Sequence, residues 1–170
     1  MPASGEAKSL PTNIERLSAG DGERLRAIRL RALRDAPEAF GTTLEEAAAR
    51  PPESWERQVT QLATFVATAS GCDVGLVRSM AHDHFTDAGY LISMWVAPEA
   101  RRHGIGSALV DAVVHWARTQ GLNRLLLDVG ERNTPAIALY TRRGFVPNGE
   151  VGTLPPPREH IREIQLIMKL

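Results

Sequence analysis

The chain has 170 residues, of which 43% are hydrophobic, and its 20 Lys and Arg residues balance its 20 Asp and Glu residues. This size and composition are those of one ordinary folded domain. A balanced charge lacks the overall attraction that nucleic acid demands, so we expect no nucleic-acid partner. The single cysteine, Cys72, excludes an intrachain disulfide and a cysteine-rich zinc site. No run approaches the roughly 18 consecutive apolar residues of a membrane helix, so we expect no membrane partner and a cytoplasmic location.

The first third of the chain begins with small and polar residues. Residues 1–11 are expected to form a frayed leader ahead of a single domain that spans residues 12–170. A short strand is expected at residues 14–17. Apolar residues then recur at helical spacing and predict a helix from near Asp21 onward. This helix should end before Pro37, because proline disfavours the helical conformation of the residue that precedes it.

Two shorter helices are expected next. Thr43 and Glu46 have the spacing of a capping box, in which each side chain binds the backbone N–H of the other residue. They predict a short helix after Thr43, which Pro51 and Pro52 should stop. Another helix is expected over residues 54–62, with Ser54 as its N-cap.

The character of the sequence then changes to that of strands. Residues 64–70 are rich in β-branched side chains and alternate in polarity, which predicts a strand. A turn at residues 71–73 leads to a returning strand at 74–80. A polar link at residues 82–87 leads to a third strand at 90–96. Three consecutive strands with short links predict an antiparallel meander.

The second half of the chain contains the clearest helix, predicted over residues 104–120 by one apolar stripe and by a glycine placed as a C-terminal cap. The remaining expected elements are a short apolar strand at 125–129, a helix at 134–143, a strand that starts at Phe145, and an alternating strand at 163–170. The predicted fold class is therefore α/β (α+β), with a mixed sheet and helices on both of its faces.

A glycine-rich segment, Arg101-Arg102-His103-Gly104-Ile105-Gly106, lies between the strand at 90–96 and the helix at 104–120. A helix N-terminus offers unpaired backbone N–H groups and the positive end of the helix dipole, which suit phosphate. The segment is not a P-loop, because no Gly-Lys-Ser/Thr sequence exists in the chain. It is not the dinucleotide fingerprint either, because the third glycine is replaced by Leu109. By itself it is either a phosphate site or a helix start with two convenient glycines.

A second motif follows in the order Asn133, Ala136, Tyr140 and Gly144-Phe145. Together, Arg-x-x-Gly-x-Gly and Asn-x-x-Ala-x-x-x-Tyr-x-x-x-Gly-Phe resemble the GCN5-related N-acetyltransferase (GNAT) superfamily. The resemblance covers roughly residues 91–146 and the general order of strands and helices on either side. It implies a mostly antiparallel sheet of six to seven strands with one splayed parallel pair. It also implies an acyl-CoA-dependent N-acyltransferase that uses acetyl-CoA as co-substrate and requires no metal.

The resemblance assigns the cofactor to particular positions. The loop after the strand would hold the pyrophosphate through backbone N–H groups, and Asn133 would bind the pantetheine amides. Met94 to Val96 would pair with the pantetheine arm, and the Val96 N–H would polarise the thioester carbonyl. The side chain of Trp95 is expected to pack or to form a pocket wall. The residues so assigned are Met94, Trp95, Val96, Arg101, Arg102, His103, Gly104, Ile105, Gly106, Ser107, Asn133, Ala136 and Tyr140.

Two residues are expected to be catalytic. Tyr140 would protonate the departing thiolate, since a phenol with a pKa near ~10 is a suitable donor; its alternative role is packing a helix onto the sheet. Asp128 would accept the proton of the attacking amine. In the ribosomal-protein alanine acetyltransferases a glutamate precedes the tyrosine by twelve residues, and here the shorter aspartate stands at that place. The alternative for Asp128, an ion pair with a nearby arginine or a loop cap, stays open.

The acceptor is less defined by the sequence. A compact chain without a peptide-docking extension favours a small-molecule amine over a protein N-terminus or lysine. A coenzyme-A-binding sensor without catalysis is a further alternative, which the presence of Tyr140 and Asn133 disfavours. The proline-rich loop at 152–162 could form a wall of the acceptor cleft or contact a second subunit in a homodimer. His82, Asp83 and His84 suggest a metal, but an ordinary polar turn explains them better.

Overall fold

In the computed structural model, which describes residues 10–82 and 84–170, seven strands form one sheet in the order β1-β2-β3-β4-β5-β7-β6. The elements along the chain are β1 (Thr12–Arg16), α1 (Gly22–Asp35), η1 (Pro37–Ala39), α2 (Leu44–Ala48), α3 (Pro52–Gln61), β2 (Ala63–Ala69), β3 (Cys72–Ala81), β4 (Ala88–Val96), η2 (Pro98–Ala100), α4 (Ile105–Thr119), β5 (Arg124–Gly130), α5 (Thr134–Arg142), β6 (Val146–Thr153) and β7 (Arg162–Lys169). Most of the expected leader, residues 1–9, lies outside the described residues, as does Asp83. In the part of the chain that the structure describes, no helix has the length and apolar character needed to cross a membrane.

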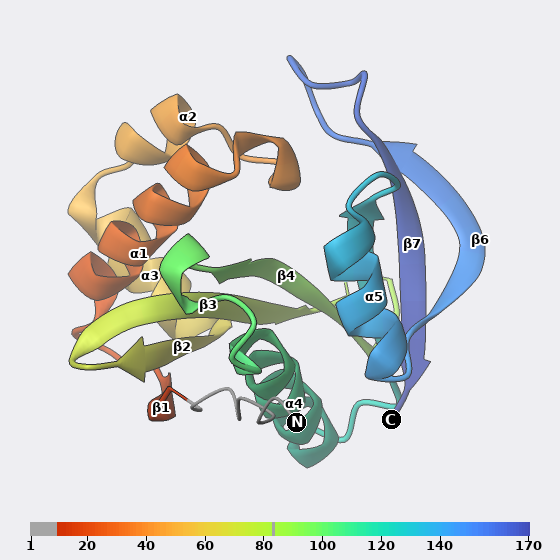
Figure 1. Cartoon of the computed structure of the whole chain (residues 1–170), viewed down its shortest axis with the longest axis horizontal. Coiled ribbons are helices and arrows are strands. Elements are labelled where there is room, and N and C mark those ends of the chain that lie inside the picture. Colours follow the sequence, from red (N-terminus) through yellow and green to blue (C-terminus); the bar gives the residue numbers. More distant parts are fainter. Residues whose placement is uncertain (1–9, 83) are drawn as a thin grey trace, which may run out of the picture.

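The sheet is antiparallel except where β4 lies beside β5. These two parallel strands pair at only three positions, of which the last is Tyr90 with Leu126. Beyond that pair the two strands diverge, and Figure 1 shows β4 turned away from β7 and α5. The predicted fold class, a mostly antiparallel sheet with one splayed parallel pair, is therefore confirmed, and so is the meander of β2, β3 and β4.

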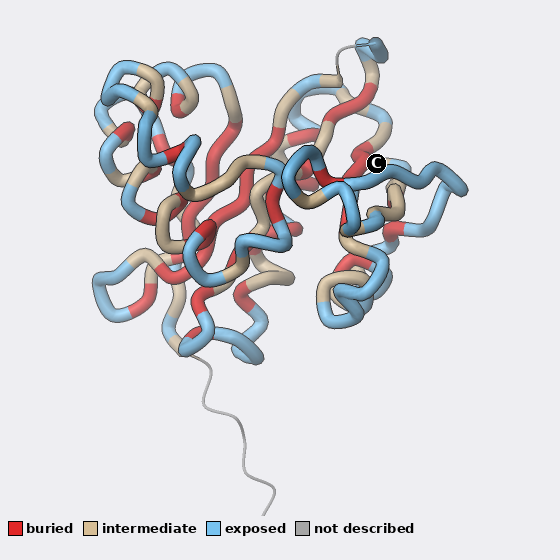
Figure 2. Tube along the Cα trace, turned by 90° about the horizontal axis from the view of Figure 1, so that it is seen from above, coloured by how far each residue is buried: buried red, intermediate tan, exposed pale blue. Residues whose placement is uncertain are grey.

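Two sets of helices cover opposite faces of the sheet (Figure 1). A Cβ atom added to Gly75 of β3 would lie 3.0 Å from the Leu109 side chain, so α4 packs on that face. Arg78 of the same strand instead reaches Gln58 on α3. Because strand residues an odd number apart point to opposite faces, α3 and its neighbour α1 cover the second face. Figure 2 shows the buried segments running between these layers.

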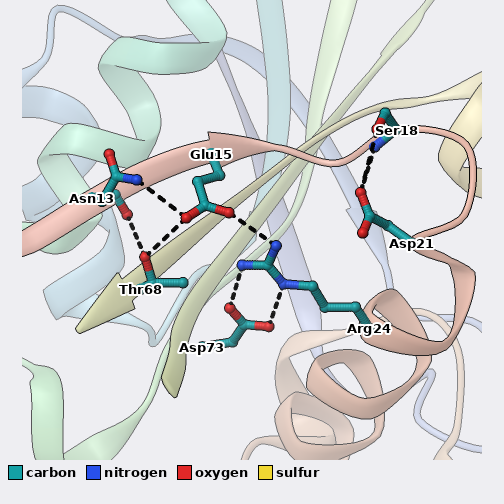
Figure 3. Close-up of polar contacts among 7 residues, drawn as sticks. All are labelled: Asn13, Glu15, Ser18, Asp21, Arg24, Thr68 and Asp73. Atoms are coloured by element: carbon teal, nitrogen blue, oxygen red, sulfur yellow. Dashed lines mark hydrogen bonds and ion pairs between the residues drawn. The ribbon is translucent and has the colours of Figure 1, made fainter. Parts of the chain in front are cut away.

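The first helix is held to the sheet by Arg24, which lies at the centre of the polar network in Figure 3. Its Nε and Nη2 donate to both carboxylate oxygens of Asp73 at 2.8 and 2.7 Å, and its Nη1 donates to Glu15 at 2.9 Å. These hydrogen bonds raise the pKa of the Arg24 guanidinium despite its partial burial. The network therefore fixes α1 against both β1 and the start of β3.

Of the two predicted helix caps in the first third of the chain, one is confirmed and one is wrong. The capping box is confirmed, because Glu46 N–H donates to Thr43 Oγ1 at 3.1 Å and Thr43 N–H donates to Glu46 Oε2 at 2.9 Å. The prediction that Ser54 caps the next helix is wrong, because α3 already begins at Pro52. Proline lacks the N–H that would stay unpaired in a first helical turn, and its φ angle is already helical.

Other boundaries differ slightly from the prediction. The turn between β2 and β3 consists of Ser70 and Gly71, both with positive φ, rather than residues 71–73. Two such residues match the right-handed twist of a tight hairpin, which lets β3 begin earlier. The helices and strands predicted after residue 103 agree with α4, β5, α5, β6 and β7 to within one residue at each end.

Candidate active site

The loop between β4 and α4 ends at the N-terminus of a helix of 15 residues. Gly104 is the N-cap and has a φ of +78°, a conformation that residues with a Cβ rarely adopt. Gly106 has a different requirement, because a Cβ there would lie 3.0 Å from Leu139 on α5. The first N–H groups of α4 have no partner within the helix and point along the positive end of its dipole. The loop thus has the helix start on which the predicted anion site depends, and the anion site itself stays a prediction.

The two arginines of this loop have different surroundings. Arg101 Nε donates to the Val96 carbonyl at 2.9 Å, and its Nη2 pairs with Asp35 at 2.6 Å. The same Asp35 oxygen accepts a hydrogen bond from Trp95 Nε1 at 2.9 Å, and the Trp95 side chain is buried. Trp95 therefore packs between α1 and the sheet, while Arg101 is partly neutralised. Arg102 lies exposed, and its φ is +66°.

Beyond Tyr90 and Leu126 the strands β4 and β5 diverge, and the gap between them is here called the splay. The edge of β4 that faces away from β3 presents backbone groups to this gap. Ala97 N–H donates to the Val74 carbonyl of β3 at 2.8 Å. Because successive peptide groups of a strand point to opposite edges, the Val96 N–H points away from β3 and toward the splay. Ser93 has a φ of +59°, and the register of β3 and β4 shifts between Leu76 and Arg78. This bulge turns β4 at the place where it leaves β5.

Helix α5 contains the second predicted motif and lies beside α4. Asn133 is its N-cap, and its Oδ1 accepts a hydrogen bond from Ala136 N–H at 3.3 Å. Tyr140 is buried, and its ring lies edge-to-face with Phe145 at 5.9 Å between centroids. Burial raises the pKa of the Tyr140 hydroxyl. No partner for this hydroxyl is found among the described residues, and it stays protonated at neutral pH.

Asp128 lies on the sheet face opposite α5. It is exposed, and its Oδ1 accepts a hydrogen bond from Gln165 Nε2 of β7 at 3.1 Å. It lines an open groove of about 520 Å³ that Glu150 and Glu163 also line. Burial and the negative charge of Asp128 raise the pKa of Glu163. Among the described residues Asp128 forms no ion pair with an arginine. Arg124 also lines the groove, so three carboxylates against one guanidinium leave it a net negative charge that suits an amine.

The remaining loop positions are placed as follows. In the cradle, His103 is exposed, the Ile105 side chain is buried, and Ser107 is half-buried, as are Met94 on β4 and Ala136 on α5. The proline-rich loop lies against the segment after α1, where Arg158 donates hydrogen bonds to the carbonyls of Pro37 and Gly41. This contact joins the β6–β7 side of the molecule to the α1–α2 side.

The predicted polar turn contains no metal cluster within the described range. His82 stacks on Tyr90 at 4.8 Å, and its Nδ1 accepts the N–H of His84 at 3.0 Å. No group of three or more His, Cys, Asp or Glu residues suited to a metal is found in residues 10–82 and 84–170. These contacts hold the imidazole of His82 in place, and Asp83 lies outside the described residues.

The sequence interpretation missed two buried arginines near the splay, Arg29 of α1 and Arg78 of β3. The Nε and Nη2 of Arg78 donate to the hydroxyl of Ser93 at 3.0 and 2.9 Å. Each arginine stands in a position that the surrounding apolar pattern assigns to the core. That mismatch between residue type and pattern is the signal that could have identified them.

Comparison with known proteins identifies relatives of this chain. A sequence model described as the acetyltransferase (GNAT) family matches residues 26–145. A mycothiol acetyltransferase from Thermobispora bispora is 34% identical over 129 residues, which are 74% of this chain and 43% of that protein. The chain therefore spans less than half the length of this relative.

Solved structures show the same fold. The ribosomal-protein-alanine N-acetyltransferase from Brucella melitensis superposes with a TM-score of 0.75 at 23% identity, over 93% of this chain and 99% of that one. A GNAT family acetyltransferase from Elizabethkingia anophelis with acetyl-CoA bound superposes with a TM-score of 0.65 at 17% identity, over 94% and 98%.

Proposed function

The chain belongs to the acetyltransferase (GNAT) family, and from this we propose that it transfers the acetyl group of acetyl-CoA to the amine of an acceptor. The observation that carries the proposal is the end of β4–β5 pairing at Tyr90 and Leu126. The N-terminus of α4, which is suited to a pyrophosphate, follows β4, and α5, which carries Tyr140, contacts that N-terminus through Leu139 and Gly106. A cofactor between the strands would have its phosphates at α4 and its thioester at the bulge of β4.

The cofactor side of the reaction is assigned to α4, α5 and the free edge of β4. The backbone N–H groups of residues 102–106 bind the pyrophosphate, with Arg102 as the free charge at the rim. The Met94 to Val96 edge pairs with the pantetheine arm, and the Val96 N–H donates to the thioester oxygen as negative charge develops there. Asn133 uses its Oδ1 to cap α5, so its Nδ2 group is the donor toward a pantetheine carbonyl.

The chemical step requires one base and one acid. A primary amine with a pKa near ~10 is mostly protonated at neutral pH, so a proton must be removed before attack. Asp128 accepts that proton, directly or through water, and the nitrogen lone pair forms the new N–C bond. The C–S bond then breaks, and Tyr140 gives its proton to the leaving sulfur. The phenol of Tyr140 is protonated at neutral pH, as a proton donor must be.

The acceptor is proposed to be a small molecule. The proline-rich loop packs on the segment near Gly41, so it lies against the α1–α2 side of the molecule and leaves that side less open to a large acceptor. The name of the Thermobispora relative, which refers to mycothiol, also supports a small acceptor. A lysine acceptor would require a surface for peptide on both sides of its side chain, and a protein N-terminus would require one on one side of its amine.

The wider setting is part of the same proposal. A single domain over residues 12–170 would act in the cytoplasm, either alone or as a homodimer, and without nucleic acid, membrane or metal. Light scattering on the purified chain, measured across a range of concentrations, tests the homodimer.

Thiol release from acetyl-CoA across a panel of amines tests the function. We expect turnover that follows the acceptor and is lost in Tyr140→Phe, while calorimetry shows that this variant still binds acetyl-CoA. Binding of acetyl-CoA by the wild-type chain without turnover of any amine would instead support the catalytically silent sensor.

A further inference from the structure

Two arginine side chains lie in the interior on the sheet face that α1 and α3 cover. Arg29 is 4% exposed and Arg78 is 5% exposed. The guanidinium of Arg29 lies 4.5 Å from the ring centroid of Phe40, and its Nη1 is sealed from solvent without a hydrogen-bond partner. Burial of a charged group is costly unless it is paired, so two such arginines require an explanation.

No carboxylate of the described residues neutralises this pair. On α1, Asp35 is bound to Arg101 and Trp95. On α3, Glu56 accepts the N–H groups of Gly20 and Gly22 at the start of α1. The ion pairs found in residues 10–82 and 84–170 include neither Arg29 nor Arg78.

The charges that act on Arg29 and Arg78 are positive. Burial and the neighbouring charges of Arg78 and Arg50 lower the pKa of Arg29 to about 9. Burial and Arg50 likewise lower the pKa of Arg78 to about 10. The three arginines, Arg29, Arg50 and Arg78, therefore form a cluster of positive charge, here called the arginine cluster. Glu46, the capping partner of Thr43, lies near Arg50 at the surface. No ion pair of Arg29 or Arg78 is found among the described residues.

The hydrogen bonds of Arg78 hold its guanidinium in place and leave donors over. Its Nε and Nη2 share the Ser93 hydroxyl, and its Nη1 donates to Gln58 at 2.8 Å. Each terminal nitrogen carries two hydrogens and uses one of them here, so one N–H on each terminal nitrogen is free for another acceptor. A planar carboxylate is the acceptor that such a fixed fork matches best.

The arginine cluster lies beside the proposed reaction centre. Arg78 pairs with Ile92 on β4, next to the bulge at Ser93. The last parallel pair is Tyr90 with Leu126, so two residues further along each strand Ile92 and Asp128 are at matching positions on the same face. With strands about 4.8 Å apart, the backbones of Arg78 and Asp128 are separated by roughly 10 Å plus the opening of the splay.

We propose that Arg78 and Arg29 form a subsite for the carboxylate of the acceptor, and that the acceptor is a small amino acid whose amine is acetylated. This inference rests on the proposed function, because it places the amine near Asp128 and the thioester. The carboxylate supplies the missing counter-charge to the arginine cluster, and the acidic groove supplies the opposite charge for the amine. An acceptor with a carboxylate and an amine close together then binds across β3, β4 and β5, with its carboxylate at Arg78 and its amine at Asp128.

Matched acceptors test the subsite. The rate of thiol release is measured with acetyl-CoA and a set of amino acids, their carboxamides, their decarboxylated amines, and a phosphorylated amine of similar length. We expect kcat/KM for the best amino acid to exceed that of its carboxamide by about 100-fold, the size of a lost charge-assisted pair. Equal rates for acid and carboxamide, or preference for the phosphorylated amine, would overturn the assignment.

Two variants and a control locate the effect. Arg29→Met is expected to raise KM for the amino acid at least tenfold, while the rate with the carboxamide and KM for acetyl-CoA stay within twofold. Because Arg78 also holds Ser93 at the bulge of β4, Arg78→Met is judged by the ratio of kcat/KM for acid to carboxamide, which is expected to fall at least tenfold. Arg26→Met is the control, because Arg26 lies one turn earlier on α1 and pairs with Glu23 at the surface. If Arg78→Met does not fold, the result with Arg29→Met alone supports or overturns the subsite. Equal losses with acid and carboxamide would show a structural role and overturn the subsite.

A binding measurement separates this inference from the proposed function. If no amine is turned over, transfer itself has failed, and the subsite is then judged by calorimetry with the same amino acids and carboxamides. Binding of the acid but not of the carboxamide, lost in Arg29→Met, supports the subsite without catalysis. The absence of any difference between acid and carboxamide overturns it.

Discussion

Replacement of Tyr140 by phenylalanine separates the chemistry of this residue from its packing. The Tyr140 ring is buried and contacts Phe145, and phenylalanine retains that ring. The hydroxyl has no partner among the described residues, so its removal breaks no hydrogen bond found there. We therefore expect the free energy of unfolding to change by less than about 1 kcal/mol, or roughly 2–4 °C in Tm.

The effect on catalysis should be far larger. Loss of a general acid lowers kcat by about 10²–10⁴-fold, which corresponds to roughly 3–5 kcal/mol in the activation barrier. Thiol release under saturating acetyl-CoA measures kcat, and urea denaturation of the same preparation measures stability. A variant that retains more than a tenth of the wild-type kcat would refute the role of Tyr140 as proton donor. A loss of several kcal/mol in stability would show that the hydroxyl has a structural partner.

The pH dependence of stability gives an independent check on the same residue. Burial raises the pKa of Tyr140 in the folded state above its ordinary value of 10. The unfolded chain therefore releases this proton first, so the contribution of Tyr140 is full below about pH 10 and is lost as the pH rises further. Tyr140→Phe should remove this alkaline loss, and wild type and variant should diverge in urea midpoint only above about pH 10.

Three further predictions concern the loop, the base and the buried charge. Gly104→Ala should lower the free energy of unfolding by about 1–2 kcal/mol through backbone strain alone, because the φ of Gly104 is +78° and an added Cβ would meet no atom within 4 Å. Urea denaturation measures this loss, and calorimetry should show weaker binding of acetyl-CoA. Asp128→Asn should lower kcat by about 10²–10⁴-fold, and it should also lower the pKa of Glu163, because a neighbouring negative charge is removed. Carbon NMR of the Glu163 carboxyl measures this pKa, and an unchanged pKa would mean that the two groups do not interact. Arg29→Met should stabilise the fold by about 1–4 kcal/mol, because it removes a buried and unpaired charge; a lower urea midpoint would show that Arg29 has a partner in the free protein.

Much of the fold could be predicted because its signals are local. The capping box of Thr43 and Glu46 spans four residues, and the helix start at Gly104 is visible as a glycine-rich turn after a strand. The predicted cap at Ser54 failed for a local reason too, since a proline can begin one helix as well as end another. Local competition of this kind moves boundaries but does not change the order of the elements.

The tertiary contacts of the site could not be predicted in the same way. Asp35 accepts hydrogen bonds from both Trp95 and Arg101, which lie 60 and 66 residues further along the chain. Nothing in the residues around Asp35 indicates either partner. The cofactor loop motif indicated two available arginines, and this contact leaves only Arg102 free to face a phosphate.

The two sides of the proposed site differ in how they are encoded. The cofactor side is a turn and two helix starts, whose requirements for glycine and for a cap are met within a few residues. The acceptor side draws Arg29 from α1, Arg78 from β3 and Asp128 from β5, and each is one residue in an otherwise ordinary amphipathic or apolar element. A charged residue in a core position is costly, so it is expected to persist only where a ligand or partner compensates it. Arg29 and Arg78, which occupy core positions without a carboxylate partner among the described residues, therefore indicate where the acceptor binds more directly than any local motif does.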